Sequence, residues 1–100
     1  MALTPESARF SLVWTATFER TARKFLRRHP NLKGIFEDVL RQLETDPRVP
    51  RLRLHPLKGR HKGKHAASLT YEHRIVLILR MKEKEIVLLD VGTHDDVYRG

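Results

Sequence analysis

The spacing of hydrophobic positions changes twice along this chain. Residues 10–14 (FSLVW) form a short apolar run of the kind found in strands. Between residues 18 and 43, apolar side chains recur every three or four positions, which predicts two amphipathic helices. From residue 66 the pattern returns to strands, because AASLTY alternates and the segments 74–79 and 86–91 are almost continuously apolar.

Local signals place the ends of these elements. Thr15 or Thr17 can cap the first helix, whose apolar stripe leaves a basic outer face. Pro30 breaks it, because proline disfavours helical geometry in the residue before it, and Asn31 suits the cap of the second helix. That helix is expected to stop near residue 46, and residues 82–85 (KEKE) to form the turn between the last two strands.

The predicted order is β-α-α-β-β-β, an α+β fold. The near-continuous apolar strands need a covered face, and the two helices are the only elements available to cover it. We therefore expect a helical hairpin packed on one face of a small, mainly antiparallel sheet. A chain of 100 residues supports one core of this size, so residues 1–100 are expected to form a single domain with residues 1–8 as a flexible arm.

The net charge of the chain indicates the kind of molecule that it binds. Twenty Lys and Arg against twelve Asp and Glu give a net charge of +8, which favours encounters with polyanions. The segment 48–71 contains seven Lys and Arg and no acid. Such a segment is either a solvated surface loop or a nucleic-acid footprint, and the charge alone does not decide between them.

Several classes are disfavoured. Cysteine is absent, so disulfides and thiolate metal sites are excluded, and no apolar run approaches the ~20 residues of a membrane span. The N-terminus lacks the pattern of a secretion signal, and we expect a cytoplasmic protein. His61 and His65 are four residues apart, a spacing that could hold a zinc ion if both lay on one helix. The glycines around them argue against a helix there, and no metal or other cofactor is expected.

Chemistry-bearing residues gather at the end of the last strand, in THDDVYR (residues 93–99). Together with the histidines and arginines of the basic segment, they suit metal-free cleavage of RNA. That reaction needs a proton acceptor at the ribose 2′-oxygen, a proton donor at the departing 5′-oxygen, and a cation beside the phosphorus. Histidine titrates close to neutrality and arginine grips two phosphate oxygens at once.

Three stretches carry a resemblance to a known family. HPLKG (residues 55–59), EHRIVL (72–77) and GTHDDVY (92–98) stand in the order and spacing of the RelE/ParE superfamily of bacterial toxins, and the chain most resembles its YafQ and YoeB types. The resemblance implies a small basic protein that cuts messenger RNA in the decoding site of the ribosome. It also implies a cognate antitoxin as partner, which we expect to present an acidic, amphipathic segment.

The same resemblance assigns roles to individual residues. His55 matches the general base of the related nucleases, Arg74 their transition-state arginine, and His94 and Tyr98 their terminal histidine and aromatic residue. His94 is then the proton donor and Tyr98 a platform for a base. Each has a structural alternative: a solvated loop histidine, an arginine paired with Glu72 or Asp95, and a packed terminal tail.

The chain also departs from the family pattern. Ser68 replaces a histidine found in YafQ-like enzymes, Glu72 and His73 replace an aspartate and a tryptophan, and Ala67 replaces a RelE-type lysine. His65 lies on the same predicted strand as Ala67 and faces the same way, so it is a candidate to compensate. The catalytic candidates are His55, Arg74, His94, Tyr98, His65 and Glu72, and the RNA-binding candidates are Arg51, Arg53, Lys58, Arg60, Lys62, Lys64 and His73.

Three functions follow from these observations. The histidine–arginine set favours a ribosome-dependent messenger-RNA endonuclease. A ParE-like toxin that inhibits a topoisomerase by binding would not need that set. A noncatalytic RNA- or ribosome-binding module would need charge without proton-transfer groups.

Overall fold

The computed structural model describes residues 9–99, so the expected flexible arm at residues 1–8 lies outside the described residues. Strand β1 (Ser11–Trp14) leads into helix α1 (Ala16–Arg28), and helix α2 (Lys33–Thr45) follows after a short 3₁₀ turn. Three longer strands come next, β3 (His65–Ser68), β4 (His73–Arg80) and β5 (Glu85–Thr93). The predicted β-α-α-β-β-β order is confirmed, with a two-residue strand β2 (His55–Pro56) and a final helix α3 (His94–Arg99) added to it.

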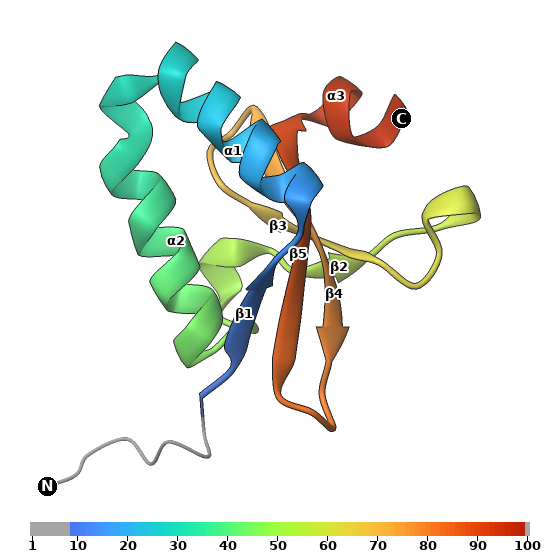
Figure 1. Ribbon diagram of the computed structural model, residues 1–100. Coiled ribbons are helices and arrows are strands. Elements are labelled where there is room, and N and C mark those ends of the chain that lie inside the picture. Colours follow the sequence, from blue (N-terminus) through green and yellow to red (C-terminus); the bar gives the residue numbers. More distant parts are fainter. Residues whose placement is uncertain (1–8, 100) are drawn as a thin grey trace, which may run out of the picture.

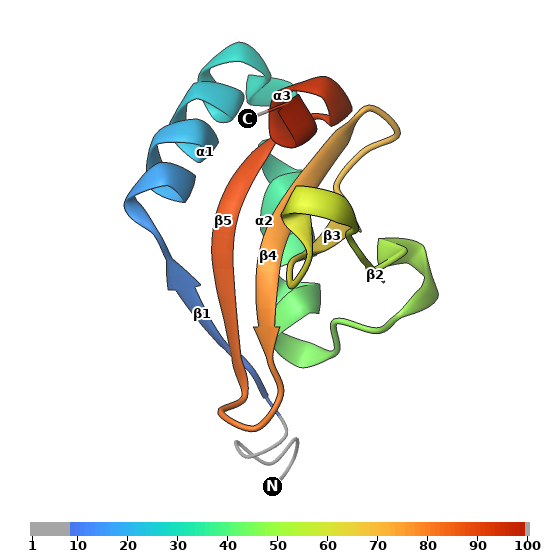
Figure 2. The same cartoon turned by 90° about the vertical axis from the view of Figure 1, so that its right-hand side faces the viewer.

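The sheet has the order β1-β5-β4-β3-β2, and β1 alone runs parallel to its neighbour. Helices α1 and α2 cover one face, as predicted (Figure 1). Figure 2 shows the other face, over which α3 and the loop that follows β2 are folded. We call this second surface the open face.

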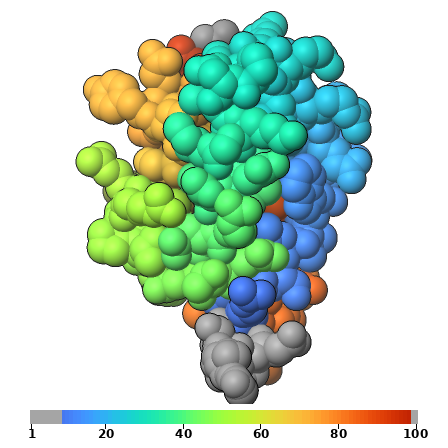
Figure 3. Space-filling model, turned by 90° about the vertical axis from the view of Figure 1, so that its left-hand side faces the viewer, coloured from blue at the N-terminus to red at the C-terminus, as the bar shows by residue number. Residues whose placement is uncertain are grey.

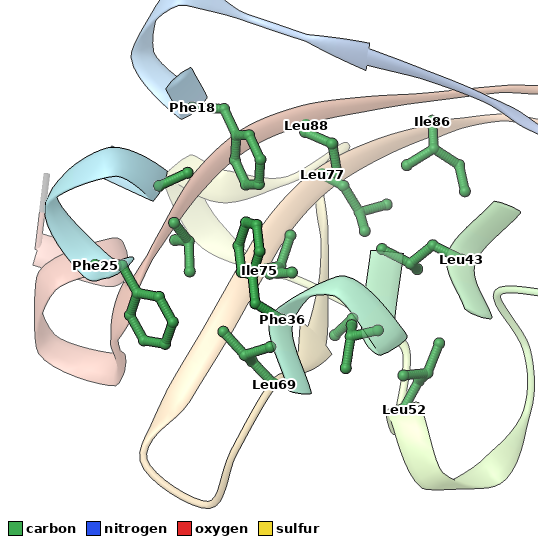
Figure 4. Close-up of a cluster of buried hydrophobic side chains, with 14 of the residues drawn as sticks. Phe18, Phe25, Phe36, Leu43, Leu52, Leu69, Ile75, Leu77, Ile86 and Leu88 are labelled. Atoms are coloured by element: carbon green, nitrogen blue, oxygen red, sulfur yellow. The ribbon is translucent and has the colours of Figure 1, made fainter. Parts of the chain in front are cut away.

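Aromatic and aliphatic side chains fill the space between the helices and the sheet (Figure 4). Phe18 and Phe36 stack with their ring centroids 6.2 Å apart, and Phe25 lies 5.9 Å from Phe36. The helix periodicity predicted these positions, because all three fall on the apolar stripes of α1 and α2. No helix in the part of the chain that the structure describes is long and apolar enough to cross a membrane.

The cap of α1 ties the helix to the sheet. Thr15 accepts a hydrogen bond from the backbone N–H of Phe18 and donates one to the carbonyl oxygen of Leu88 at 2.7 Å. The expected cap of α2 is wrong: Asn31 lies inside the 3₁₀ turn Pro30–Leu32, and the residue before α2 is Leu32, which makes no side-chain cap. Proline fixes the backbone at the start of this turn, so the chain reverses there without a polar cap.

A β-bulge in β5 sets the direction of the final residues. Leu77 pairs with Leu88 and Val76 with Asp90, so Leu89 has no partner on β4. The extra residue shifts the alternation, and Leu88 and Val91 both face the core. The N–H of Val91 is satisfied by the hydroxyl of Thr21 on α1 at 3.3 Å and by the carboxylate of Asp90.

Candidate active site on the open face

Register places two of the candidate residues, His55 and Arg74, on the same face as Ser68. Ser68 pairs with Arg74, and Arg74 pairs with Gly92, so these residues form one row across β3, β4 and β5. His55 pairs with Ala66, which lies two residues from Ser68 on β3 and therefore shares its face. Ile75, the neighbour of Arg74, is buried in the core on the opposite side. The open face thus carries His55, Ser68 and Arg74.

Arg74 lies between the two candidate proton-transfer histidines. His55 stands two strands away and two residues along the sheet, roughly 12 Å from Arg74 between Cα atoms by ideal sheet spacing. His94 follows β5, the strand on the other side of Arg74, two residues beyond Gly92. The backbone positions of the three residues therefore form a diagonal across the sheet, with Arg74 in the middle.

The guanidinium of Arg74 is held by backbone oxygens. Its Nη1 donates to the carbonyl oxygens of Thr70, Tyr71 and His73 at 3.1–3.2 Å. Among the residues that the structure describes, Arg74 forms no ion pair, so the alternative of a pair with Glu72 or Asp95 is not what is found. Its charge is left without a carboxylate partner, which keeps it available to an anion.

The last helix brings a small cluster of rings to the upper end of the open face. The rings of His94 and Tyr98 meet edge to face with centroids 4.2 Å apart. His61, from the loop before β3, donates its Nε2–H to the carbonyl oxygen of Tyr98 at 3.1 Å and lies 5.9 Å from its ring. The basic loop and the chain end are therefore joined at His61. The sequence analysis considered His61 only as a metal ligand and did not predict this contact, because no periodic pattern links a loop to a helix 37 positions away.

Two candidate histidines face the helices instead. His73 is only 6% exposed and packs edge to face on Phe25 and His29, and its Nδ1 lies 2.8 Å from the hydroxyl of Thr70. Burial lowers the pKa of His73, and the nearby His29 lowers it further. A buried ring of this kind has little surface to offer to RNA.

His65 shares the face of Ala67, as the sequence predicts, but that face is the core side of the sheet. Its Nδ1 is buried without a hydrogen-bond partner, and burial lowers the pKa of the ring, helped by the charge of Arg48 and of His55. Arg74 points to the opposite side of the sheet. The structure thus does not bring His65 and Arg74 together, and Glu72 is exposed on the turn before β4.

The remaining candidates surround the open face. The side chain of Arg53 is exposed, and its backbone lies in the left-handed region at φ 49°. One residue separates it from the start of β2. Lys58, Arg60, Lys62 and the half-buried Lys64 stand in the loop that folds over the sheet. This loop has two left-handed glycines, at φ 66° and 94°, which its sharp turns require. No group of three or more metal-ligating side chains occurs within residues 9–99.

The structure is thus a small α+β domain of a basic chain, with histidine and arginine residues on its open face. The sequence model described as "Bacterial toxin of type II toxin-antitoxin system, YafQ" matches residues 10–99. The chain therefore belongs to the YafQ family of type II toxin-antitoxin toxins, within the RelE/ParE superfamily. A search of curated proteins finds no match.

Solved structures show the same fold at low identity. A YoeB/ParE toxin from Agrobacterium tumefaciens superposes with a TM-score of 0.71 at 22% identity, over 85% of this chain and 99% of that one. YafQ in the Escherichia coli DinJ-YafQ toxin-antitoxin complex gives 0.72 at 19% identity, over 90% and 98%. The Mycobacterium tuberculosis RelBE2 toxin-antitoxin complex gives 0.63 at 20% identity, over 87% and 93%.

Proposed function

We propose that this protein is the toxin of a toxin-antitoxin pair and that it cuts messenger RNA at the ribosome without a metal ion. The observation that carries the proposal is the position of Arg74 between His55 and His94 on the open face. A phosphodiester laid along this diagonal meets a cation at phosphorus and an imidazole on either side.

The chemistry runs through the ribose 2′-hydroxyl. His55 takes its proton while the 2′-oxygen attacks the adjacent phosphorus, and Arg74 stabilises the negative charge of the phosphorane. His94 gives a proton to the 5′-oxygen as the P–O bond breaks. The products are a 2′,3′-cyclic phosphate and a free 5′-hydroxyl, so atoms and protons balance.

Tyr98 has a positioning role in this proposal. Its ring already packs on His94, and a base stacked on the same cluster would be fixed relative to the proton donor. The basic residues around the face hold the phosphates of messenger and ribosomal RNA. A protein with this target acts in the cytoplasm, where the ribosomes are.

The partner follows from the family and from charge. Two structural neighbours are toxin-antitoxin complexes, and this chain carries +8 with a basic outer face on α1. We expect a cognate antitoxin whose acidic, amphipathic segment covers the cationic surface.

One experiment separates this function from its two alternatives. The 5′ ends of messages are mapped after a pulse of expression, and plasmid supercoiling is measured in the same cells. Cuts in phase with codons support the nuclease. Altered supercoiling without such cuts would support a ParE-like topoisomerase inhibitor, and neither change would support a noncatalytic RNA-binding module.

A further inference from the structure

A pocket of about 360 Å³ lies beside Arg74 and the β3–β4 turn. Helix α2, the segment around residue 52 and this turn enclose it, and Figure 3 shows the last two segments along one side of α2. The proposed chemistry uses only Arg74 from its walls. The polar residues that line it are Asp38, Arg51, Arg53, Ser68, Thr70, Tyr71 and Arg74.

Tyr71 stands at the rim of this pocket with its side chain in water. It is 95% exposed, whereas the core phenylalanines are buried and Tyr98 packs against two histidines. A fully exposed aromatic ring gains nothing from the fold. Exposed rings beside cationic side chains are the usual platforms on which single-stranded bases stack.

The turn that carries Tyr71 is firmly held. Arg74 donates to the carbonyl oxygens of Thr70 and Tyr71, and the hydroxyl of Thr70 accepts from the N–H groups of Glu72 and His73. The ring is therefore presented on an ordered turn that is tied directly to the proposed transition-state arginine. Little ordering is needed when a base binds.

The far wall supplies positive charge. Arg51 and Arg53 are exposed, and no ion pair of either occurs within residues 9–99. The one carboxylate of the wall, Asp38, is paired with Arg41 on its own helix. Arg53 holds a left-handed backbone, a conformation that costs a non-glycine residue free energy and that clusters at functional sites.

We infer that this pocket binds one nucleotide of single-stranded RNA next to the one that is cut, with its base on Tyr71 and its phosphate between Arg51 and Arg53. The volume is that of a small-ligand site. The inference rests on the proposed function for its substrate class. It assigns to Tyr71 a contact with RNA that is separate from cleavage.

Binding of an uncleavable RNA tests the inference. The probe is a fluorescent six-nucleotide oligoadenylate, 2′-O-methylated throughout, and its affinity is measured by anisotropy for the parent, Tyr71→Phe and Tyr71→Ala. We expect Tyr71→Ala to bind roughly 5- to 100-fold more weakly, the usual worth of stacking one base, and Tyr71→Phe to bind like the parent. Met81→Ala, at another exposed turn, is the matched control and should leave affinity unchanged.

A second probe isolates the base. Replacing each base of the oligonucleotide in turn by an abasic sugar should, at one position, remove the difference between parent and Tyr71→Ala. The inference would be overturned if the parent and Tyr71→Ala bound the intact probe with equal affinity. It would be overturned in the same way if Tyr71→Ala weakened association with an acidic antitoxin segment but not binding of the probe. Because the probe cannot be cut, a failure of cleavage would overturn the proposed function and leave this result unaffected.

Discussion

Asp96 sits directly over Gly92. A Cβ atom added to Gly92 would lie 2.9 Å from the Cβ of Asp96, closer than folded proteins allow. Asp96 also accepts a hydrogen bond from the N–H of Thr93, and its own N–H donates to the hydroxyl of Thr93. This reciprocal cap fixes the start of α3, and the missing side chain of Gly92 lets α3 lie against the sheet.

Gly92→Ala should therefore displace α3 together with His94 and Tyr98. We expect the free energy of unfolding to fall by about 1–3 kcal/mol, as in other overpacked sites, and cleavage to fall further than that loss explains. Thermal unfolding and single-turnover cleavage on one preparation measure both. Gly34→Ala is the control, because an added Cβ there meets nothing within 4 Å and an exposed helix gains stability from alanine. If Gly92→Ala cleaved at the parental rate, the position of α3 would not affect cleavage.

Stability should depend on pH through His73, which is buried, and through His65, which is half-buried. Burial lowers the pKa of both His65 and His73 in the folded protein. As pH falls below the ordinary histidine value of about 6.5, the unfolded chain takes up protons that the folded protein does not. The free energy of unfolding should therefore decrease as pH falls below about 6.5.

His73→Phe tests the origin of this pH dependence. Phenylalanine keeps a ring against Phe25 but cannot be protonated, so the fall in stability between pH 6.5 and 5 should become shallower. Urea unfolding of the parent and the variant at several pH values measures the slope. An unchanged slope would mean that His73 does not contribute to it.

The basic segment that includes Arg53 before β2 and the loop after β2 should hold RNA through its charge. Replacing Arg53, Lys58 and Lys62 by Gln should weaken ribosome binding and flatten its salt dependence, because fewer counterions are released. The control removes the same charge from the exposed helix surface, at Arg23, Arg27 and Lys33. Binding is measured at several salt concentrations. If the two triple variants lost affinity equally, net charge would account for binding and the segment would have no special role.

Association with the antitoxin should be electrostatically steered. The net charge of +8 predicts fast association with an acidic partner, slowing as salt screens the attraction. Stopped-flow mixing of the purified proteins at 50 and 500 mM salt measures the rate. A salt-independent rate would contradict this description of the partner surface.

The sequence predicted the helices and strands in which hydrophobic residues recur at a regular spacing. Phe18, Phe25 and Phe36 fell on helical stripes, and the strands 74–79 and 86–91 lie within β4 and β5. It missed α3, because six residues are too few for a periodic signal and the helix forms only where it packs on β4 and β5. Strand β3 runs over His65–Ser68 and not to residue 71, since Thr70 and His73 close a turn there.

From the sequence, only the residue types of the site and the residues that share a face of the sheet could be predicted. The alternation placed Arg74 opposite Ile75, and the register confirms that they face different sides. The same rule put His65 with Ala67, but it did not say which side carries the helices. The contact of His61 with Tyr98 and the pocket beside Tyr71 depend on how loops fold over the sheet, which no local pattern encodes.

The central claim is that the open face performs proton transfer and not only binding, and His94→Ala tests it most directly. Single-turnover cleavage of ribosome-presented message, ribosome affinity and melting temperature are measured for the parent and His94→Ala on the same preparations. We predict a rate lower by roughly 10²–10⁴, the usual worth of a positioned general acid, with affinity and melting temperature unchanged. A folded, ribosome-bound His94→Ala that cuts at the parental rate would contradict the account.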